Sequence, residues 1–198
     1  MKKILIASSN QGKIKEIRDK FCKYKLEFSG QREFFGLEPV EEDGRSFKEN
    51  ALKKARIRAQ ECGLLTLADD SGLVVEHLDG RPGIYSARYA GKEATDRENN
   101  QKLLKELRGV PRNHRQAYFQ CVMALIDPRT EQEITVKGIC KGIITEELQG
   151  NEGFGYDPLF YVPEYERTMA ELPLSVKNKI SHRAKALEKL EKYLEKIV

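Results

Sequence analysis

The order of apolar patterns along the chain restricts the fold more than any other sequence feature. A short apolar run over residues 3–8 leads into a polar loop, and four residues then recur at helical spacing, namely Ile14, Ile17, Phe21 and Cys22. Helical and extended patterns alternate in the first half of the chain, whereas long extended stretches over about residues 115–127 and 132–145 follow later. This order predicts an α/β fold in which helices flank a mixed β-sheet.

Start signals predict three further helices. Ser46 and Thr95 each begin the Ser/Thr-x-x-Glu spacing of a capping box, and the first box opens a helix over about residues 47–62. A last apolar stripe predicts a helix that begins near Ser181 and carries Ile197. This stripe indicates that the last helix docks on the body of the protein.

An acidic segment follows a buried strand in the middle of the pattern. Residues 64–68 read as a strand that ends at Asp69-Asp70-Ser71-Gly72, and residues 73–76 continue as a second extended segment. Adjacent residues of a strand point to opposite sides, so we expect one of the two aspartates to face a ligand. Carboxylates at a strand end hold a hard cation and orient water, whereas the alternative interpretation is a plain Asp-Ser-Gly turn.

Composition limits the class of protein. The 198 residues fit one domain over residues 1–198, with or without a second lobe, and no Pro, Gly or Ser-rich linker divides them. The net charge of +4 comes from 35 basic and 31 acidic residues spread along the chain, which suits anionic ligands without requiring nucleic acid. No apolar run approaches the ~20 residues of a membrane span. We therefore expect a cytoplasmic protein with neither membrane nor nucleic acid as a partner.

The cysteines carry no sign of a metal or redox site. They stand far apart, without zinc-ligand spacing, at Cys22, Cys62, Cys121 and Cys140. We expect them to be small buried hydrophobes in a reducing compartment.

Residues 8–13 form the first candidate binding segment. The loop places hydroxyls, an amide, a glycine backbone and the Lys13 ammonium at the amino end of a helix, where unpaired backbone NH groups suit phosphate oxygens. It is not a Walker loop, because GxxxxGK[ST] is absent. The alternative is that Ser9 or Asn10 caps the helix and Lys13 is solvated.

A second acidic segment precedes the helix over residues 47–62. Glu41-Glu42-Asp43-Gly44 supplies oxygen ligands that complete a Mg²⁺ site together with phosphates and water. Read alone, this segment is better explained as a solvated acidic loop.

Two further segments offer contacts for a ring. In Gly153-Phe154-Gly155-Tyr156-Asp157-Pro158 the glycines let the backbone approach a ligand and an aromatic presents its face, although a rigid turn has the same composition. In residues 175–183 cations gather at and before a helix start, where the helix dipole disfavours them. His182 and Arg183 there indicate an anionic or carbonyl ligand, unless they are ordinary surface side chains.

Several of these segments together resemble the inosine triphosphate pyrophosphatase family, the non-standard purine NTP pyrophosphatases. The matching segments are Ser9-Asn10-x-x-Lys13-x-x-Glu16, Glu42-x-Gly44-x-x-Phe47-x-Glu49-Asn50-Ala51, Lys53-Lys54-Ala55, Ala68-Asp69-Asp70-Ser71-Gly72-Leu73, Pro82-Gly83-Ile84-Tyr85-Ser86-Ala87-Arg88, residues 153–158 and Ser181-His182-Arg183. Each segment is weakly specific, but their order over nearly the whole chain is strongly specific.

The resemblance implies a fold, an activity and residue roles. It implies an elongated mixed α/β sheet in two lobes around a central cleft, a homodimer, and Mg²⁺-dependent hydrolysis of ITP, dITP and XTP to the monophosphate and pyrophosphate. By position, the implied triphosphate and nucleotide contacts are Ser8, Ser9, Asn10, Gln11, Gly12, Lys13, Lys54 and Ser71, and the implied base pocket is Phe154, Gly155, Tyr156, Asp157, Lys177, His182 and Arg183. Asp70 and Lys13 are the implied catalytic residues, and the implied metal ligands are Asp70 with Glu42 or Glu41.

The sequence departs from the family at two positions, and it leaves two rivals open. Ser9 stands where glycine is common, and Asp43 stands where threonine is common, which leaves open whether Glu41 or Glu42 faces the metal. One rival is a Maf-like pyrophosphatase that acts on pyrimidine or modified nucleotides. The other is a nucleic-acid-binding module that stacks bases on Phe154 or Tyr156, although the acidic segments would repel a phosphate backbone.

Overall fold

The computed structural model describes residues 2–34, 37–130 and 132–196. Its α-helices are α1 (Gln11–Phe21), α2 (Phe47–Cys62), α3 (Asp96–Glu106), α4 (Leu174–Ile180) and α5 (His182–Leu194). Its strands are β1 (Lys2–Ile6), β2 (Leu26–Gly30), β3 (Leu65–Val75), β4 (Gln116–Asp127), β5 (Gln132–Ile144), β6 (Phe160–Val162) and β7 (Arg167–Thr168). Within these residues the strands form one seven-stranded sheet in the order β2-β1-β3-β4-β5-β6-β7.

Parallel and antiparallel pairing both occur in this sheet. β1 pairs in parallel with β2 and with β3, whereas β6 pairs antiparallel with β5 and with β7. Parallel neighbours need a crossover connection, and the helices α1 and α2 lie in the connections from β1 to β2 and from β2 to β3. The predicted α/β fold with a mixed sheet flanked by helices is therefore confirmed.

The chain gathers into two compact units. The first unit comprises Met1–Asp70, Cys121–Gly138 and Arg183–Val198, and the second comprises Ser71–Gln120 and Ile139–His182. The chain passes from one unit to the other within β3, β4 and β5 and at the start of α5. The expected single domain with two lobes around a cleft stays a prediction.

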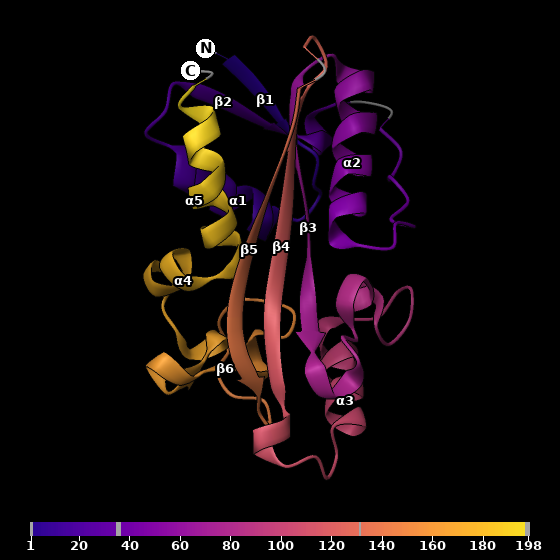
Figure 1. Cartoon of the computed structure of the whole chain (residues 1–198), viewed down its shortest axis with the longest axis vertical. Coiled ribbons are helices and arrows are strands. Elements are labelled where there is room, and N and C mark those ends of the chain that lie inside the picture. The colour runs from indigo at the N-terminus through magenta and orange to yellow at the C-terminus, as the bar shows by residue number, and fades with distance from the viewer. Residues whose placement is uncertain (1, 35–36, 131, 197–198) are drawn as a thin grey trace. The chain divides into compact units, whose positions relative to one another are not determined.

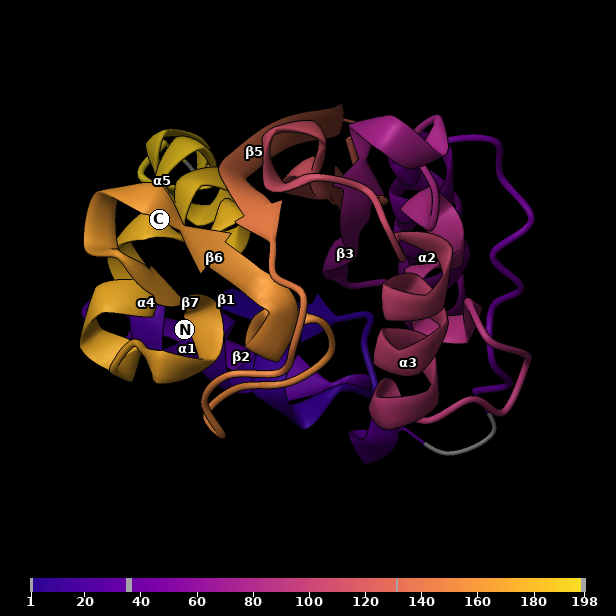
Figure 2. The same ribbon diagram turned by 90° about the horizontal axis from the view of Figure 1, so that it is seen from below.

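In the first unit, helices cover both faces of the strands. α2 lies on one side of β3 and β4, and α1 and α5 lie on the other (Figure 1); Figure 2 shows β3 between the same helices. Ile4 and Ile6 of β1 join the core cluster that includes apolar residues of α1 and α5, whereas Leu5 is fully buried outside that cluster. Successive residues of β1 are thus buried on opposite sides, as expected for a strand whose two faces are both covered.

The second unit has its own core beneath α3. Leu103 and Leu107 are fully buried there with Leu73 of β3, and the Phe119 and Phe160 rings pack with their centroids 4.5 Å apart. This core fixes the strands and turns from which the second set of candidate residues projects.

Local end signals predicted two helices well. Ser46 Oγ accepts a hydrogen bond from Glu49 N at the start of α2, and Thr95 and Glu98 form a complete capping box at the start of α3. The box at Ser46 is half formed, because the Glu49 carboxylate accepts instead from the NH of Arg45. The last predicted helix is α5, and the position of Ile197 lies outside the described residues.

One prediction about secondary structure is wrong, and one short helix was not predicted. The segment Asp69-Asp70-Ser71-Gly72 does not end a strand, because β3 runs without a break through it. Buried cations described below compensate the two carboxylates, so the strand continues past them. The helix start expected near Ser181 is confirmed, because α5 begins at His182, whereas the short helix α4 just before it was not predicted.

The cysteine prediction is partly wrong. Cys121 and Cys140 are buried, Cys62 is half-buried and Cys22 is exposed, and all four are free thiols. Cys22 follows the last residue of α1, where the chain leaves the helix, so it does not join the apolar stripe. Among the described residues, no helix combines the length and the apolarity that crossing a membrane requires.

Candidate active site

The polar loop before α1 leads into a helix whose first turn has no acidic side chain to compensate the helix dipole. Asn10 Oδ1 accepts a hydrogen bond of 3.1 Å from Lys13 N, so Asn10 and not Ser9 caps the helix. Ser8 Oγ accepts from Asn10 N at 3.2 Å. The first turn of α1 contains no acidic residue, so the partial positive charge of the helix end is left for an anion. Ser9 and Gln11 are exposed, and Gly12 is half-buried.

Asp69 and Asp70 lie on opposite faces of β3, as expected for neighbours in a strand. Leu65 and Leu67 belong to the core cluster formed with α1 and α5, and Asp69 continues their side of the strand. Asp70 lies on the other side and contacts α2. Two adjacent carboxylates therefore meet different helices and different cations.

Asp69 is held between cations from α1 and α5. Its Oδ2 lies 2.9 Å from Lys13 Nζ and 3.4 Å from Arg183 Nη2, and its side chain is 1% exposed. Burial alone would raise the pKa of Asp69, but the charges of Lys13, Arg183 and Lys54 outweigh burial and hold that pKa well below its usual range. The Cys121 thiol lies 4.0 Å from Asp69, and burial together with that carboxylate raises its pKa to about 12, so Cys121 stays protonated.

Asp70 has the opposite electrostatic environment. Its Oδ2 accepts a 2.9 Å hydrogen bond from Asn50 Nδ2, and its Oδ1 lies 3.5 Å from Lys54 Nζ. Burial raises the pKa of Asp70, Lys54 opposes this, and the neighbouring Glu42 carboxylate raises it again, with a net upward shift. A carboxylate whose pKa is raised by its surroundings is a better proton acceptor than an ordinary aspartate.

Lys54 joins Asp70 to the loop before α2. Its Nζ donates to Glu42 Oε1 at 2.7 Å, while the neighbouring Glu41 side chain is exposed. Burial would lower the pKa of Lys54, but the carboxylates of Asp70, Glu42 and Asp69 outweigh it and raise that pKa. Lys54 therefore stays a cation between two carboxylates.

Asn50 fixes both the loop and Asp70. It is fully buried, and while its Nδ2 donates to Asp70, its Oδ1 accepts a 2.8 Å hydrogen bond from Gly44 N. A Cβ on Gly44 would lie 2.6 Å from Asn50 Oδ1 and 2.9 Å from Glu49 Cβ, so this approach requires glycine. The position of Glu42 is thus tied to that of Asp70 through main chain and side chain.

The donor set on this side of β3 suits a hard cation. Among the described residues, no three His, Cys, Asp or Glu side chains gather closely enough to hold a metal ion by themselves. Mg²⁺ is usually bound through one or two carboxylates with substrate phosphates and water as the other ligands. Glu42 and Asp70 are such a pair, and the Glu42 carboxylate contributes to the raised pKa of Asp70. The residues therefore fit a metal that arrives with a phosphate ligand.

The second unit holds a buried ion pair beside a glycine. Lys177 Nζ lies 2.6 Å from Asp157 Oδ2, and both side chains are 11% exposed. Gly153 has φ +90°, and a Cβ there would lie 2.1 Å from Asp157 Oδ2 and 2.3 Å from Lys177 Nζ. Glycine is therefore required for the main chain to pass this ion pair. The Phe154 ring is 41% exposed next to it.

α3 braces the turn that contains these residues. Asn100 Nδ2 donates to Gly155 O at 2.8 Å, and Gly155 N donates to Asp96 Oδ2 at 2.7 Å. The buried Tyr156 hydroxyl donates to Ser86 O at 2.8 Å. These bonds hold residues 153–157 in one conformation while the Phe154 ring remains accessible.

The remaining candidate residues separate by unit. The His182 ring stacks on Phe119 in the second unit, with centroids 4.9 Å apart, and Ser71 is half-buried in β3. Arg183 belongs to the first unit, is 2% exposed, and donates to Glu16 and Asp69. Its charge at a helix start is thus compensated by carboxylates of the protein itself. The prediction that both sets face one cleft stays a prediction.

Sequence reasoning missed several residues that shape these two clusters. Asn50 belongs to a segment that matches the family, but the sequence assigned no function to it. A polar side chain beside an apolar helical stripe does indicate a buried contact. Asp69 and Glu16 were likewise matched without a role. Asp96 and Asn100 gave no signal, because their contact with Gly155 joins segments more than fifty residues apart in sequence.

The mixed sheet flanked by helices defines an α/β protein, and its open helix start and the lysine between two carboxylates suit an anionic ligand and a cation. The sequence profile described as the Ham1 family matches residues 4–193. The chain therefore belongs to the Ham1 family.

Named relatives agree with this assignment. A dITP/XTP pyrophosphatase from Desulforamulus reducens is 51% identical over 197 residues, which cover 98% of this chain and 96% of the relative. A protein of the same name from Listeria monocytogenes is 48% identical, covering 100% of this chain and 97% of the relative. The solved structure of a HAM1 protein from Coxiella burnetii has a TM-score of 0.92 and 44% identity, covering 99% of this chain and 100% of that one. The resemblance inferred from the sequence is confirmed.

Proposed function

We propose that this chain is a metal-dependent nucleoside triphosphate pyrophosphatase that converts ITP, dITP and XTP to the monophosphate and pyrophosphate, and so cleanses the nucleotide pool. The observation that carries the proposal is the cluster in which Lys54 lies between the carboxylates of Glu42 and Asp70. The names of full-length relatives supply the substrate class.

Glu42 and Asp70 are the residues that would hold Mg²⁺. The ion would neutralise phosphate charge and help to activate water. Glu42 is preferred over Glu41 because its carboxylate lies 2.7 Å from the same lysine that approaches Asp70, whereas Glu41 is exposed. Lys54, freed by the metal from its pairs with these carboxylates, would be available for phosphate oxygens.

The reaction is an in-line displacement at the α-phosphorus. Water attacks, the bond to the bridging oxygen breaks, and pyrophosphate leaves with that oxygen. Asp70 accepts the proton of the attacking water, a role that its raised pKa supports. Lys13 and Lys54 stabilise charge on the phosphates, and the NH groups at the start of α1 bind further phosphate oxygens. Ser8, Ser9, Asn10, Gln11 and Gly12 provide this cradle, and Ser71 contacts the nucleotide.

Residues of the second unit provide the base contacts. The exposed face of Phe154 suits stacking, and the braced turn over Gly155 and Tyr156 presents main-chain groups. Lys177, held by Asp157, and His182 supply donors for the carbonyl that hypoxanthine and xanthine carry at position 6. Adenine presents an amino donor there, and leaving buried polar groups mismatched gives discrimination of ~10⁴ or more.

The family resemblance supports a dimer, and the composition of the sequence supports a cytoplasmic location. We place it in the cytoplasm as a homodimer, with a nucleoside triphosphate as its partner and neither nucleic acid nor membrane. The four free thiols are compatible with a reducing compartment.

A product assay tests the proposal. ITP, dITP, XTP, the common NTPs and modified pyrimidine triphosphates are incubated with the protein, with Mg²⁺ or with a chelator, and pyrophosphate and phosphate are measured separately. We expect pyrophosphate from the deaminated purine nucleotides in the presence of the metal. Release of single phosphates, a preference for pyrimidines, or salt-sensitive binding of single strands without turnover would contradict it.

A further inference from the structure

A chain of charged side chains lies behind Lys13. The Lys13 ammonium is 2.9 Å from Asp69 Oδ2, and its side chain is 16% exposed while that of Asp69 is 1% exposed. Asp69 is thus too deeply buried to meet a nucleotide or a solvated ion. Lys13, in contrast, keeps part of its surface at the amino end of α1. The contact between them joins a buried anchor to an accessible cation.

Arg183 supports the anchor from the other side. Its Nη2 lies 3.4 Å from the same Asp69 oxygen, its Nη1 donates to Glu16 Oε2 at 2.9 Å, and its side chain is 2% exposed. Glu16 stands three residues after Lys13 on α1. The series of contacts Lys13–Asp69–Arg183–Glu16 therefore begins and ends on the same helix. Two cations and two carboxylates are balanced within the cluster.

We propose that Asp69, supported by Arg183, is a positioning residue that fixes the Lys13 ammonium for the reaction. The inference rests on the proposed function, in which Lys13 contacts the phosphates. In this inference Arg183 helps to position Lys13 through Asp69, whereas the family resemblance assigns Arg183 to the base pocket.

The physical reason is the flexibility of lysine. A free lysine side chain has about 2 kcal/mol of rotamer entropy to lose when it is fixed. A lysine held by an ionised carboxylate has lost much of that freedom before substrate binds. The arginine helps to keep the carboxylate itself in place, because its guanidinium lies 3.4 Å from the same Asp69 oxygen. The Lys13 ammonium is therefore already fixed at the start of α1 when the phosphate binds.

A double-mutant cycle tests the inference. Steady-state kinetics with dITP are measured for wild type, Asp69→Asn, Lys13→Met and the double variant, at a temperature where far-ultraviolet circular dichroism shows each to be folded. We expect Asp69→Asn to lower kcat/KM about 10- to 100-fold, with the same division between kcat and KM that Lys13→Met shows. In the Lys13→Met background the same substitution should change kcat/KM by less than about threefold, since residues that act as a unit are not additive.

A structural role alone would give a different result. If Asp69→Asn lowers kcat/KM by the same factor with and without Lys13, or leaves it at the wild-type value, the positioning role is excluded. A wild-type protein that releases no pyrophosphate from any nucleotide would instead overturn the proposed function, and the inference with it. The two failures are therefore distinguishable.

Two milder variants guard against loss of folding. Glu16→Gln loosens Arg183 while Asp69 stays ionised, and should give a smaller loss of kcat/KM that also disappears in the Lys13→Met background. Arg183→Lys keeps a cation for Asp69 and should retain more activity than Arg183→Gln. Equal loss in the two arginine variants would contradict the inference.

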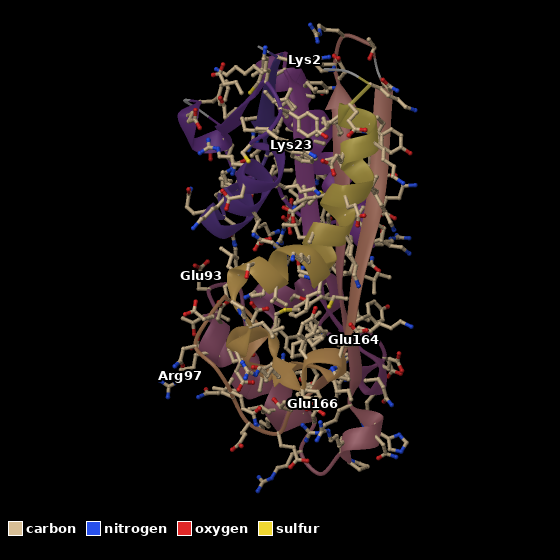
Figure 3. The ribbon with its side chains drawn as sticks, turned by 90° about the vertical axis from the view of Figure 1, so that its left-hand side faces the viewer. Lys2, Lys23, Glu93, Arg97, Glu164 and Glu166 are labelled. Atoms are coloured by element: carbon tan, nitrogen blue, oxygen red, sulfur yellow. The ribbon has the colours of Figure 1, made fainter. Side chains whose placement is uncertain are left out.

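Glu191→Gln is the matched control. Glu191 also joins α5 to α1, through Lys20 at 3.0 Å, and it pairs with Lys23, which is labelled in Figure 3. None of these residues belongs to the candidate site. This variant weakens the contact between the same two helices without touching Lys13, so kcat/KM should remain within about twofold of wild type. A loss as large as that of Asp69→Asn would show that helix docking alone explains the effect.

Discussion

Asp69 and Asp70 are neighbours in one strand, yet they differ in almost every physical respect. Asp69 meets two cations, Lys13 and Arg183, and its pKa lies well below the usual range. Asp70 meets one lysine that it shares with Glu42, and its pKa is raised. The alternation of side chains along β3 is sufficient to place them in opposite environments.

The negative charge of Asp69 is fully compensated by neighbouring cations, whereas that of Asp70 is not. Asp69 has more positive than negative charge around it, so its ionised form is stabilised by the fold. Asp70 is left with a like charge nearby, a situation that a bound cation relieves. Residues that are strained electrostatically in the free protein are the ones expected to act on a ligand.

The largest expected effect is the loss of turnover in Asp70→Asn. An amide cannot accept the proton of the attacking water, so kcat should fall by about 10³-fold or more. The free energy of unfolding should stay within about 1 kcal/mol of wild type, because a carboxylate whose charge is disfavoured is removed. Pyrophosphate release and urea unfolding measure the two quantities. Near-native kcat would remove Asp70 from the mechanism.

Asp69→Asn should have the opposite effect on folding. Removing one partner of a buried ion pair leaves Lys13 and Arg183 as poorly compensated cations, which typically destabilises by about 3 kcal/mol or more. We expect a clear fall in the midpoint of urea unfolding that Asp70→Asn does not share. If the two asparagine variants are equally stable, the comparison between the two faces of β3 breaks down.

The third prediction concerns the two glutamates before α2. Glu42→Gln should raise the metal concentration for half-maximal activity by at least about tenfold, because one of two carboxylate charges on that face is lost. Glu41→Gln is the matched control, since Glu41 is exposed and the change is the same, and it should leave the metal dependence unaltered. A metal titration of activity measures both. The reverse order of effects would exchange the roles of the two residues.

The sequence predicted those parts of the molecule that depend on near neighbours. The cap of α2 at Ser46 and the box at Thr95 each use contacts within three residues, and so does the Asn10 cap of α1. The opposite directions of Asp69 and Asp70 also follow from strand geometry alone. Local patterns therefore predicted α1, α2, α3 and α5 and the two faces of β3, but not the short helix α4.

Contacts between distant segments could not be predicted in the same way. Arg183 and Asp69 are 114 residues apart, and the sequence did not show that these charges meet. Without that knowledge, the two aspartates were expected at the end of a strand. Instead β3 continues through them, because Asp69 contacts Lys13 and Asp70 contacts Lys54. The helix dipole disfavours Arg183 at the start of α5, and the sequence indicated a ligand as compensation, whereas the structure shows that Glu16 and Asp69 compensate its charge.

The smallest expected effect is that of Glu191→Gln on stability. This variant tests whether the number of neighbouring cations or the burial of the carboxylate controls the energy of an ion pair. Glu191 resembles Asp69 in receiving two cations, Lys20 and Lys23, but it is half-buried and these lysines are 32% and 64% exposed, whereas Asp69 is fully buried. Hydrogen bonds from Lys23 and Lys20 lower the pKa of Glu191 to about 2, against about 4.3 in an unfolded chain. Because the folded pKa is the lower one, Glu191 stabilises the fold fully above about pH 4.3 and loses this contribution as the pH falls toward 2.

Glu191→Gln should therefore reduce the free energy of unfolding by about 1 kcal/mol or less at pH 7, the usual range for surface ion pairs. The difference from wild type should shrink as the pH falls from about 4.3 toward 2, and added salt should reduce it at neutral pH. Urea unfolding at several pH values, with and without salt, measures this. If Glu191→Gln destabilises as much as Asp69→Asn, the number of cations rather than burial controls the energy of these pairs, and the contrast between Asp69 and Glu191 disappears.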